Sequence, residues 1–179
     1  QHWTARPSAA HEYVGQAALT ARDSLDEVRR VVSDLAPADL ADGSGAALEA
    51  ALYRTGEQVA LDSGISVSVR IHGEPQPISP EVSTALLRCA RGALANVVEH
   101  AAATEATVSL TYQPESVSLD VRDNGIGFDP ASFTPGPTRG RGLTGIDHRA
   151  QHFGGRSAVE SAPGEGTVLA VLIPITAPR

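Results

Sequence analysis

Three short segments carry residue types that could bind a nucleotide, and they follow one another in a fixed order. Asn96 lies in a helical apolar repeat, Asp123 begins Asp-Asn-Gly-Ile-Gly after an alternating stretch, and Gly140–Leu143 precedes a further apolar repeat. A carboxylate at a strand end can accept a hydrogen bond from an exocyclic amino group, while Gly125 and Gly127 let the backbone approach a flat ring closely. The first amides of a helix are free to bind phosphate. The ordered triplet therefore predicts an ATP site.

Each segment has a common alternative explanation when it is taken alone. A mid-helix asparagine that faces away from the core is usually solvated, and turns rich in Asp, Asn and Gly are frequent. Residues 140–145 also match the dinucleotide-binding fingerprint. A Rossmann loop must follow a strand in a βαβ unit, whereas a long Pro- and Gly-rich stretch precedes Gly140, so we reject that interpretation.

Hydrophobic periodicity predicts the helices and strands that would position these segments. The expected order is helix 46–62, strand 65–71, a helix from Pro80 to about Ala101 with Ser79 as its N-cap, strands 106–112 and 116–123, helix 144–153, and strands 157–161 and 167–173. The helix from Pro80 should bury Val82, Leu86, Ala90, Ala93, Leu94 and Val97. A second stripe of that helix carries Gly92, Asn96, Glu99 and His100. We expect a mobile flap at residues 130–139 and a turn at residues 163–166.

The N-terminal residues carry a heptad pattern. Apolar residues recur at alternating spacings of four and three, at Val14, Ala18, Ala21, Leu25, Val28, Val32 and Leu35. A helix with so narrow an apolar stripe needs partner helices, so we expect it to belong to a bundle, with packing on its own domain as the alternative. Pro37 and residues 41–45 should end this helix and form a linker.

Composition limits the classes of protein to which the chain can belong. Its 179 residues and hydrophobic fraction of 41% suffice for one buried core with a helical extension. The net charge of -7 disfavours a nucleic-acid partner, because phosphate binding needs a concentrated basic face. The single Cys89 excludes an internal disulfide and suggests a buried thiol in a reducing compartment. No apolar run could span a bilayer, and the absence of methionine leads us to expect a soluble piece of a longer protein.

The motifs resemble, in order and over nearly the whole chain, the catalytic domain of histidine kinases in the GHKL ATPase superfamily, also called the Bergerat fold. Four family motifs have counterparts: the N box around Asn96, the G1 box at Asp123–Gly127, the G2 box at Gly140–Leu143 and the last glycine motif at Gly164–Thr167. The resemblance implies an α+β fold, in which a mixed, mostly antiparallel sheet packs on helices as a two-layer sandwich, preceded by one long dimerisation helix. The expected domains are residues 1–40, which would be the second helix of a dimerisation bundle, and residues 41–179, which would be the ATP-binding domain.

A narrower resemblance is to the sensor kinases that signal to LuxR-type response regulators. It rests on Leu143-Thr144-Gly145-Ile146 with Arg149 and Gly154-Gly155 beyond, and on the helix Ser24–Leu35 with Pro37-Ala38-Asp39-Leu40 after it, which is similar to the second dimerisation helix of that class. The resemblance implies a homodimeric intact kinase that takes a phosphoryl group from ATP and passes it to a LuxR-type regulator. This portion should be cytoplasmic, with any membrane contact made by upstream segments.

The resemblance also implies roles for the residues around the base and the metal. Asn96 would ligate the Mg²⁺ ion that bridges the triphosphate, since an amide oxygen suits a hard cation. Asp123 would hold the adenine amino group, with the backbone at Gly125 and Gly127 close to the base. Thr167 would join this site through water.

On the phosphate side, the resemblance assigns backbone amides to the nucleotide. These belong to Gly140, Arg141, Gly142 and Leu143, beneath a lid formed by residues 130–139. His100 stands where the family has a histidine and would line the phosphate side as a catalytic residue. A structural role is the alternative for His100.

Two positions depart from the family pattern. Gly92 stands where a glutamate usually precedes the asparagine by four residues, and Glu99 stands where a basic residue is common. The family's glutamate is usually assigned to polarise the attacking group or to support the metal, so the sequence predicts ATP binding without fixing the catalytic rate. A catalytically weak nucleotide-binding dimerisation module is therefore an alternative. An anti-sigma-factor-type serine kinase is another, although the heptad helix argues against it.

His11 followed by Glu12 superficially resembles the family's phosphoacceptor box. A box histidine needs a complete first helix, a turn and a second helix before Pro37, yet His11 lies on the same heptad repeat as Leu35. We therefore expect the phosphoacceptor histidine to lie upstream of this chain.

Overall fold

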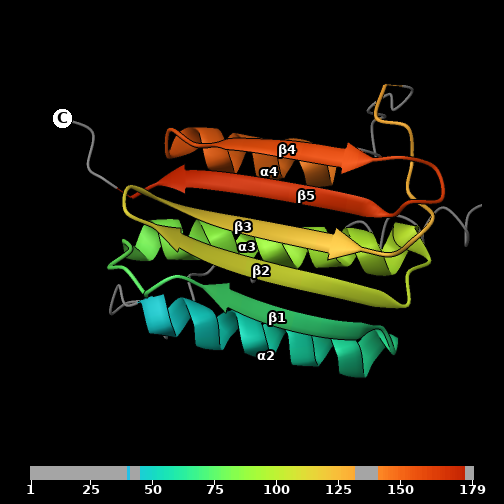
Figure 1. Ribbon diagram of the computed structural model, residues 1–179, viewed down its shortest axis with the longest axis horizontal. Helices are drawn as coiled ribbons and strands as arrows, with labels where there is room; N and C mark the ends of the chain where they lie inside the picture. The colour runs from blue at the N-terminus through green and yellow to red at the C-terminus, as the bar shows by residue number, and fades with distance from the viewer. Residues whose placement is uncertain (1–39, 41–44, 132–140, 176–179) are drawn as a thin grey trace, which may run out of the picture. The chain divides into compact units, whose positions relative to one another are not determined.

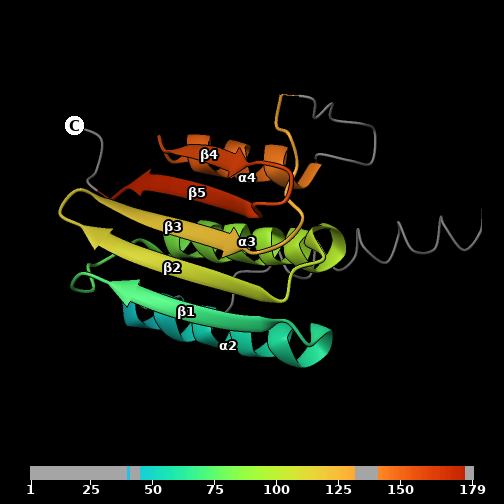
Figure 2. The ribbon, with the colours of Figure 1, turned by 45° about the vertical axis from the view of Figure 1, so that its right-hand side comes forward.

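One sheet covered on one side by helices forms the part of the chain that the structure describes. The computed structural model describes Leu40, residues 45–131 and residues 141–175, all within a unit that begins at Pro37. Helices α2 (Gly45–Ser63), α3 (Pro80–Asn96) and α4 (Arg141–His152) lie on one face of the five-stranded sheet (Figure 1). Figure 2 shows the same two layers after a turn of 45°. The predicted two-layer α+β sandwich is confirmed, whereas the predicted dimerisation helix and its domain boundary lie outside the described residues.

The sheet is mixed and mostly antiparallel, as predicted. Its strands are β1 (Ser66–His72), β2 (Glu105–Gln113), β3 (Ser116–Asp123), β4 (Arg156–Ser161) and β5 (Thr167–Pro174), in the spatial order β1-β2-β3-β5-β4. Only β1 and β2 pair in parallel, with α3 as the connection between them. The almost continuously apolar β5 lies between β3 and β4, in the interior of the sheet.

The core lies between the sheet and α3. Alternate strand residues point to the helices and are buried, among them Val108, Leu110, Leu119, Val171 and Ile173. The predicted apolar stripe of α3 is confirmed, since Val82, Leu86, Ala90, Ala93, Leu94 and Val97 are all buried. Each large apolar side chain contributes about 1.5–3 kcal/mol by leaving water. This burial fixes the rotation of α3 and therefore the direction in which its polar stripe faces.

Both ends of the predicted helix agree with the structure, but its last turn changes type. The hydroxyl of Ser79 accepts a hydrogen bond from the amide of Val82 at 3.2 Å, and Pro80 occupies the first turn. The α-helix ends at Asn96, and a π-helix, η2 (Val97–Ala101), follows it. The predicted helix from Pro80 to about Ala101 is confirmed in its length, but its last turn is a π-helix and not an α-helix. A π-turn leaves the spacing of apolar residues almost unchanged, so periodicity alone cannot detect it.

The remaining predicted boundaries hold to within one or two residues, except at α4. This helix begins at Arg141 and not at Thr144, so Gly142 and Leu143 belong to its first turn and not to a preceding loop. Because glycine is unfavourable inside a helix, the sequence interpretation assigned this glycine-rich segment to a loop.

No helix in residues 45–131 and 141–175 is both long and apolar enough to cross a membrane.

Candidate functional site

Helices α3 and α4 pack in opposite directions, and this brings the first turn of α4 to Asn96. A Cβ built on Gly142 would lie 3.0 Å from Oδ1 of Asn96, and one built on Gly92 would lie 3.6 Å from Cδ1 of Ile146. One turn further from Asn96, Cys89 lies beside Arg149, and burial raises the pKa of the Cys89 thiol while the guanidinium partly offsets this effect. The first amides of α4, which carry the positive end of its dipole, therefore lie beside the end of α3.

The side chain of Asn96 is available for a ligand. It is half-buried at the junction of α3 and η2, and within the described residues it makes no hydrogen bond. A polar side chain that is removed from water normally has a hydrogen-bond partner. Its oxygen suits Mg²⁺, which prefers oxygen ligands and usually keeps waters and phosphate oxygens in its shell. The described residues contain no group of three or more His, Cys, Asp and Glu side chains that could hold a metal ion.

Asp123 lies at the end of β3, where its carboxylate is buried and only one of its two oxygens has a hydrogen-bond partner among the described residues. Its side chain is 6% exposed, and Oδ1 accepts a hydrogen bond from the amide of Gly125 at 2.8 Å. No described residue donates a hydrogen bond to Oδ2. Thr167, the first residue of β5, pairs with Asp123 across the sheet. One carboxylate oxygen and a neighbouring hydroxyl are therefore held at the same strand end, where they can bind a polar edge of a ligand.

Ser161, which the sequence interpretation missed, fixes the hydroxyl of Thr167. Its Oγ donates to the carbonyl of Gly166 at 2.8 Å, accepts from the amide of Phe128 at 2.9 Å, and lies 3.1 Å from Oγ1 of Thr167. Because Ser161 has one proton and gives it to Gly166, Thr167 is the donor in the third contact, and its lone pairs remain for a ligand or a water. The register of the predicted hairpin could have identified Ser161, since it pairs with Thr167.

The glycines of the Asp123–Gly127 loop are required by packing within the chain. A Cβ on Gly125 would collide with the carbonyl oxygen of Ala101, which accepts a hydrogen bond from the amide of Ile126 at 2.8 Å. Gly127 has a φ of +59°, and a Cβ there would collide with the carbonyl of Ala162. The predicted approach of both glycines to a flat ring stays a prediction.

Asn124 ties this loop to the residues that follow η2. Its Oδ1 accepts hydrogen bonds from the amides of Thr104 and Glu105, each at 3.0 Å, and its Nδ2 donates to Oγ1 of Thr104 at 2.9 Å. Together with the contact at Ala101, these bonds join the strand end that carries Asp123 to the helix end beyond Asn96. The sequence interpretation treated Asn124 only as a turn residue, because nothing local indicates a partner twenty residues away.

The other predicted site residues are less constrained. His100 is exposed on η2, and its Nε2 lies 3.7 Å from Oε2 of Glu99, an exposed pair that contributes little stability. Leu143 packs on the core, which leaves its backbone amide for the phosphate role. Arg141 is the first residue of α4. Gly140 and residues 132–139 of the predicted lid lie outside the described residues.

Comparisons with known proteins identify the family of the chain. The family described as "Histidine kinase-, DNA gyrase B-, and HSP90-like ATPase" matches residues 81–177. The sensor histidine kinase MctS of Rhizobium johnstonii is 34% identical over 157 residues, which cover 87% of this chain and 33% of that protein. The signal transduction histidine-protein kinase/phosphatase DegS of Brevibacillus brevis is 30% identical over 155 residues, which cover 87% of this chain and 39% of that protein. The chain thus spans between about a third and two fifths of the length of these relatives.

Solved structures show the same fold. The ATP-binding domain of PrrB from Mycobacterium tuberculosis matches with a TM-score of 0.56 and 24% identity, over 72% of this chain and 94% of that one. The mycobacterial sensor histidine kinase MprB matches with a TM-score of 0.55 and 23% identity, over 70% of this chain and 92% of that one. Because the family described above matches residues 81–177, more than half of the chain, this chain belongs to the histidine kinase-, DNA gyrase B- and HSP90-like ATPases.

Proposed function

We propose that this chain is the ATP-binding catalytic domain of a sensor histidine kinase. The observation that carries the proposal is the position of the Asn96 amide beside the first turn of α4. That turn offers phosphate-binding amides, and the amide oxygen of Asn96 offers a metal ligand at the same place. The loop with Asp123 is tied to the same helix end through Ala101 and Asn124.

Each residue has a role that its surroundings support. Oδ2 of Asp123 accepts a hydrogen bond from the adenine amino group, and Thr167 accepts one from a water that bridges to the base. Oδ1 of Asn96 binds Mg²⁺, which neutralises charge on the phosphates when it is bound. The amides of Gly142 and Leu143 bind the phosphates at the positive end of α4, and His100 lines the phosphate side.

The reaction is the transfer of the γ-phosphoryl group to a histidine upstream of this chain. The bond between the γ-phosphorus and the bridging oxygen breaks, a bond to an imidazole nitrogen forms, and ADP leaves. The protein contributes mainly positioning and electrostatic stabilisation in such reactions. The phosphoryl group then passes to a response regulator of the LuxR type, and the intact kinase acts as a homodimer.

Gly92 favours a second candidate, a nucleotide-binding dimerisation module with little catalytic power. The position one turn before Asn96 carries no side chain that could act on the attacking group. Both candidates bind ATP, so phosphoryl transfer in a longer protein with the upstream histidine distinguishes them.

Calorimetric titration of the chain with ATP, in the presence and absence of Mg²⁺, tests the binding part of the proposal. We expect Mg²⁺ to tighten ATP binding in the wild type and to have little effect in Asn96→Ala. Gln58→Ala, which removes an exposed amide on α2, should behave as the wild type. An equal effect of Mg²⁺ in wild type and Asn96→Ala would show that Asn96 does not hold the metal.

A further inference from the structure

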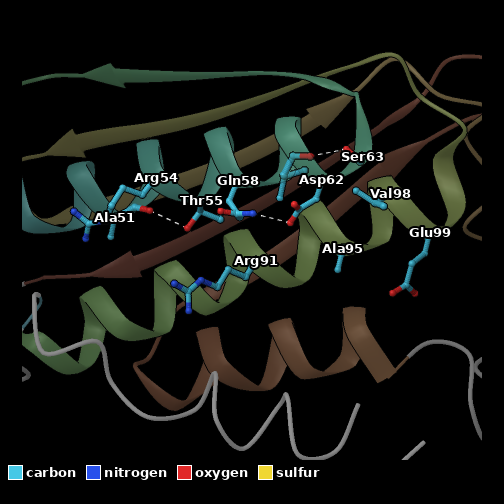
Figure 3. Close-up of a pocket in the computed structure, with 11 residues that line it drawn as sticks. Ala51, Arg54, Thr55, Gln58, Asp62, Ser63, Arg91, Ala95, Val98 and Glu99 are labelled. Atoms are coloured by element: carbon cyan, nitrogen blue, oxygen red, sulfur yellow. Dashed lines mark hydrogen bonds between the residues drawn. The ribbon is translucent and has the colours of Figure 1, made fainter. Parts of the chain in front are cut away.

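A groove lies between α2 and α3, and the proposed nucleotide site uses none of its central residues. It has a volume of about 630 Å³, and Figure 3 shows the side chains that line it. Its apolar lining comes from Ala51 and Val59 of α2, Ala95 of α3 and Val98 of η2. Val98 is 44% exposed, so the groove offers apolar surface to water.

The positively and negatively charged residues of the groove lie at opposite ends. Arg54 and Arg91 lie toward one end, and Asp62 and Glu99 lie toward the other (Figure 3). Asp62 is in the last turn of α2 and Glu99 follows the end of α3, so the negative ends of both helix dipoles add to their charge. One end of the groove therefore favours an anionic group and the other end favours a cationic group.

The charge order on α2 is self-complementary. Arg54, Gln58 and Asp62 follow one another at intervals of four residues and form one stripe, about 12 Å long, on the exposed side of the helix. If a second α2 lies antiparallel to the first, Arg54 of each copy faces Asp62 of the other, and Gln58 faces Gln58. A two-fold contact requires this type of pairing. We propose that the stripe and the groove beside it form a contact between two copies of this chain.

The surroundings of the stripe support a second copy as the occupant. Arg91 makes no ion pair or hydrogen bond within residues 45–131 and 141–175, and burial, together with the positive charge of Arg54, lowers its pKa. An acidic end from another copy would relieve this unfavourable environment.

Disulfide cross-linking of the full chain tests the contact at its two-fold axis. The native Cys89 is fully buried, so an introduced thiol dominates the reaction. Under mild oxidation, Gln58→Cys should give a covalent dimer at least about ten times faster than Glu57→Cys, which is also exposed but lies about 100° around α2 from Gln58. Equal rates for the two variants would overturn the proposal. The comparison also separates this contact from any dimer contact elsewhere in the chain.

Charge reversal provides the second arm of the test. In the Gln58→Cys background, Arg54→Glu or Asp62→Arg alone should slow cross-linking to the rate of the control, because like charges then face each other. The two reversals together should restore the fast rate, since the stripe is again self-complementary. All these positions are exposed, and equal unfolding midpoints would check that the variants fold. A double variant that cross-links no faster than the single ones would contradict the antiparallel pairing.

Discussion

Gly142 lies over the side-chain amide of Asn96, so close that a Cβ there would come within 3.0 Å of Oδ1. The absence of a side chain at residue 142 leaves room for the amide of Asn96 and for a ligand between it and the first turn of α4. Helix N-termini bind anions through such uncovered amides. We therefore predict that glycine at residue 142 is needed more for ligand binding than for the fold.

Gly142→Ala should weaken the binding of Mg-ATP while leaving the free energy of unfolding unchanged or slightly higher. Alanine favours a helix over glycine by up to about 1 kcal/mol, but its methyl group would displace the amide of Asn96. Gly145→Ala is the matched control, because a Cβ there would meet only the guanidinium of Arg149, at 3.5 Å. Calorimetry and urea unfolding measure the two effects. If both variants bind Mg-ATP equally well, the contact between Gly142 and Asn96 has no role in binding.

Asn124→Ala should lower both stability and ATP affinity, because it removes three hydrogen bonds that tie the Asp123 loop to Thr104 and Glu105. The expected loss of unfolding free energy is about 1–3 kcal/mol. Asn124→Asp keeps the acceptor for the two amides, so its loss of unfolding free energy should be smaller. Urea unfolding of the wild type and both variants measures the order of their stabilities. Equal stability of wild type and Asn124→Ala would show that these bonds do not hold the loop.

The 179-residue chain alone should not phosphorylate itself on histidine. Its candidate acceptor, His11, lies on the same heptad repeat as Leu35 and not on a separate first helix. Incubation with radiolabelled ATP, for wild type and His11→Ala, measures this. Acid-labile label in the wild type that disappears in His11→Ala would identify His11 as the acceptor and contradict the prediction.

Gly92→Glu should raise the rate of histidine phosphorylation in a longer protein that carries the upstream acceptor. The Cβ at this position would meet Ile146 at an ordinary 3.6 Å, so the backbone can accept a side chain. A general base typically contributes about a hundredfold or more, of which a site adapted to glycine would capture part. Gly92→Gln, which has the same shape without the charge, is the control. Single-turnover assays at saturating ATP compare them, and equal rates for Glu and Gln would exclude a carboxylate effect.

Periodicity predicted most of the fold because burial follows it closely. The alternation in β2 and β3 and the apolar stripe of α3 each arise from one face that must leave water. Periodicity could not show that the last turn, Val97–Ala101, is a π-helix, because the apolar residues stay buried in either type of helix. It also placed the start of α4 about one turn too late, because the glycine-rich segment before Thr144 is typical of a loop.

The sequence identified residues of the candidate site by their types, but it could not show the contacts that hold them in place. The sequence interpretation selected Asn96 and Asp123 because an amide and a carboxylate can bind a ligand directly. It did not select Asn124 and Ser161, because their hydrogen-bond partners are remote in sequence or depend on the hairpin register. Long-range hydrogen bonds of this kind require the folded chain, and the groove between α2 and α3 likewise appears only when the two helices pack.

The most direct test of the proposed nucleotide site compares ATP binding by wild type, Asp123→Asn and Asp120→Asn in calorimetric titrations with Mg²⁺. Asp120 lies three residues earlier on β3 and faces the opposite side of the sheet, so its substitution removes a charge without changing the site. Asp123→Asn should weaken ATP binding by roughly 1–3 kcal/mol, because its amide cannot accept the adenine amino group's hydrogen bond as the carboxylate does. Asp120→Asn should bind ATP as the wild type does. Equal ATP affinity in all three proteins would contradict the assignment of Asp123 to adenine.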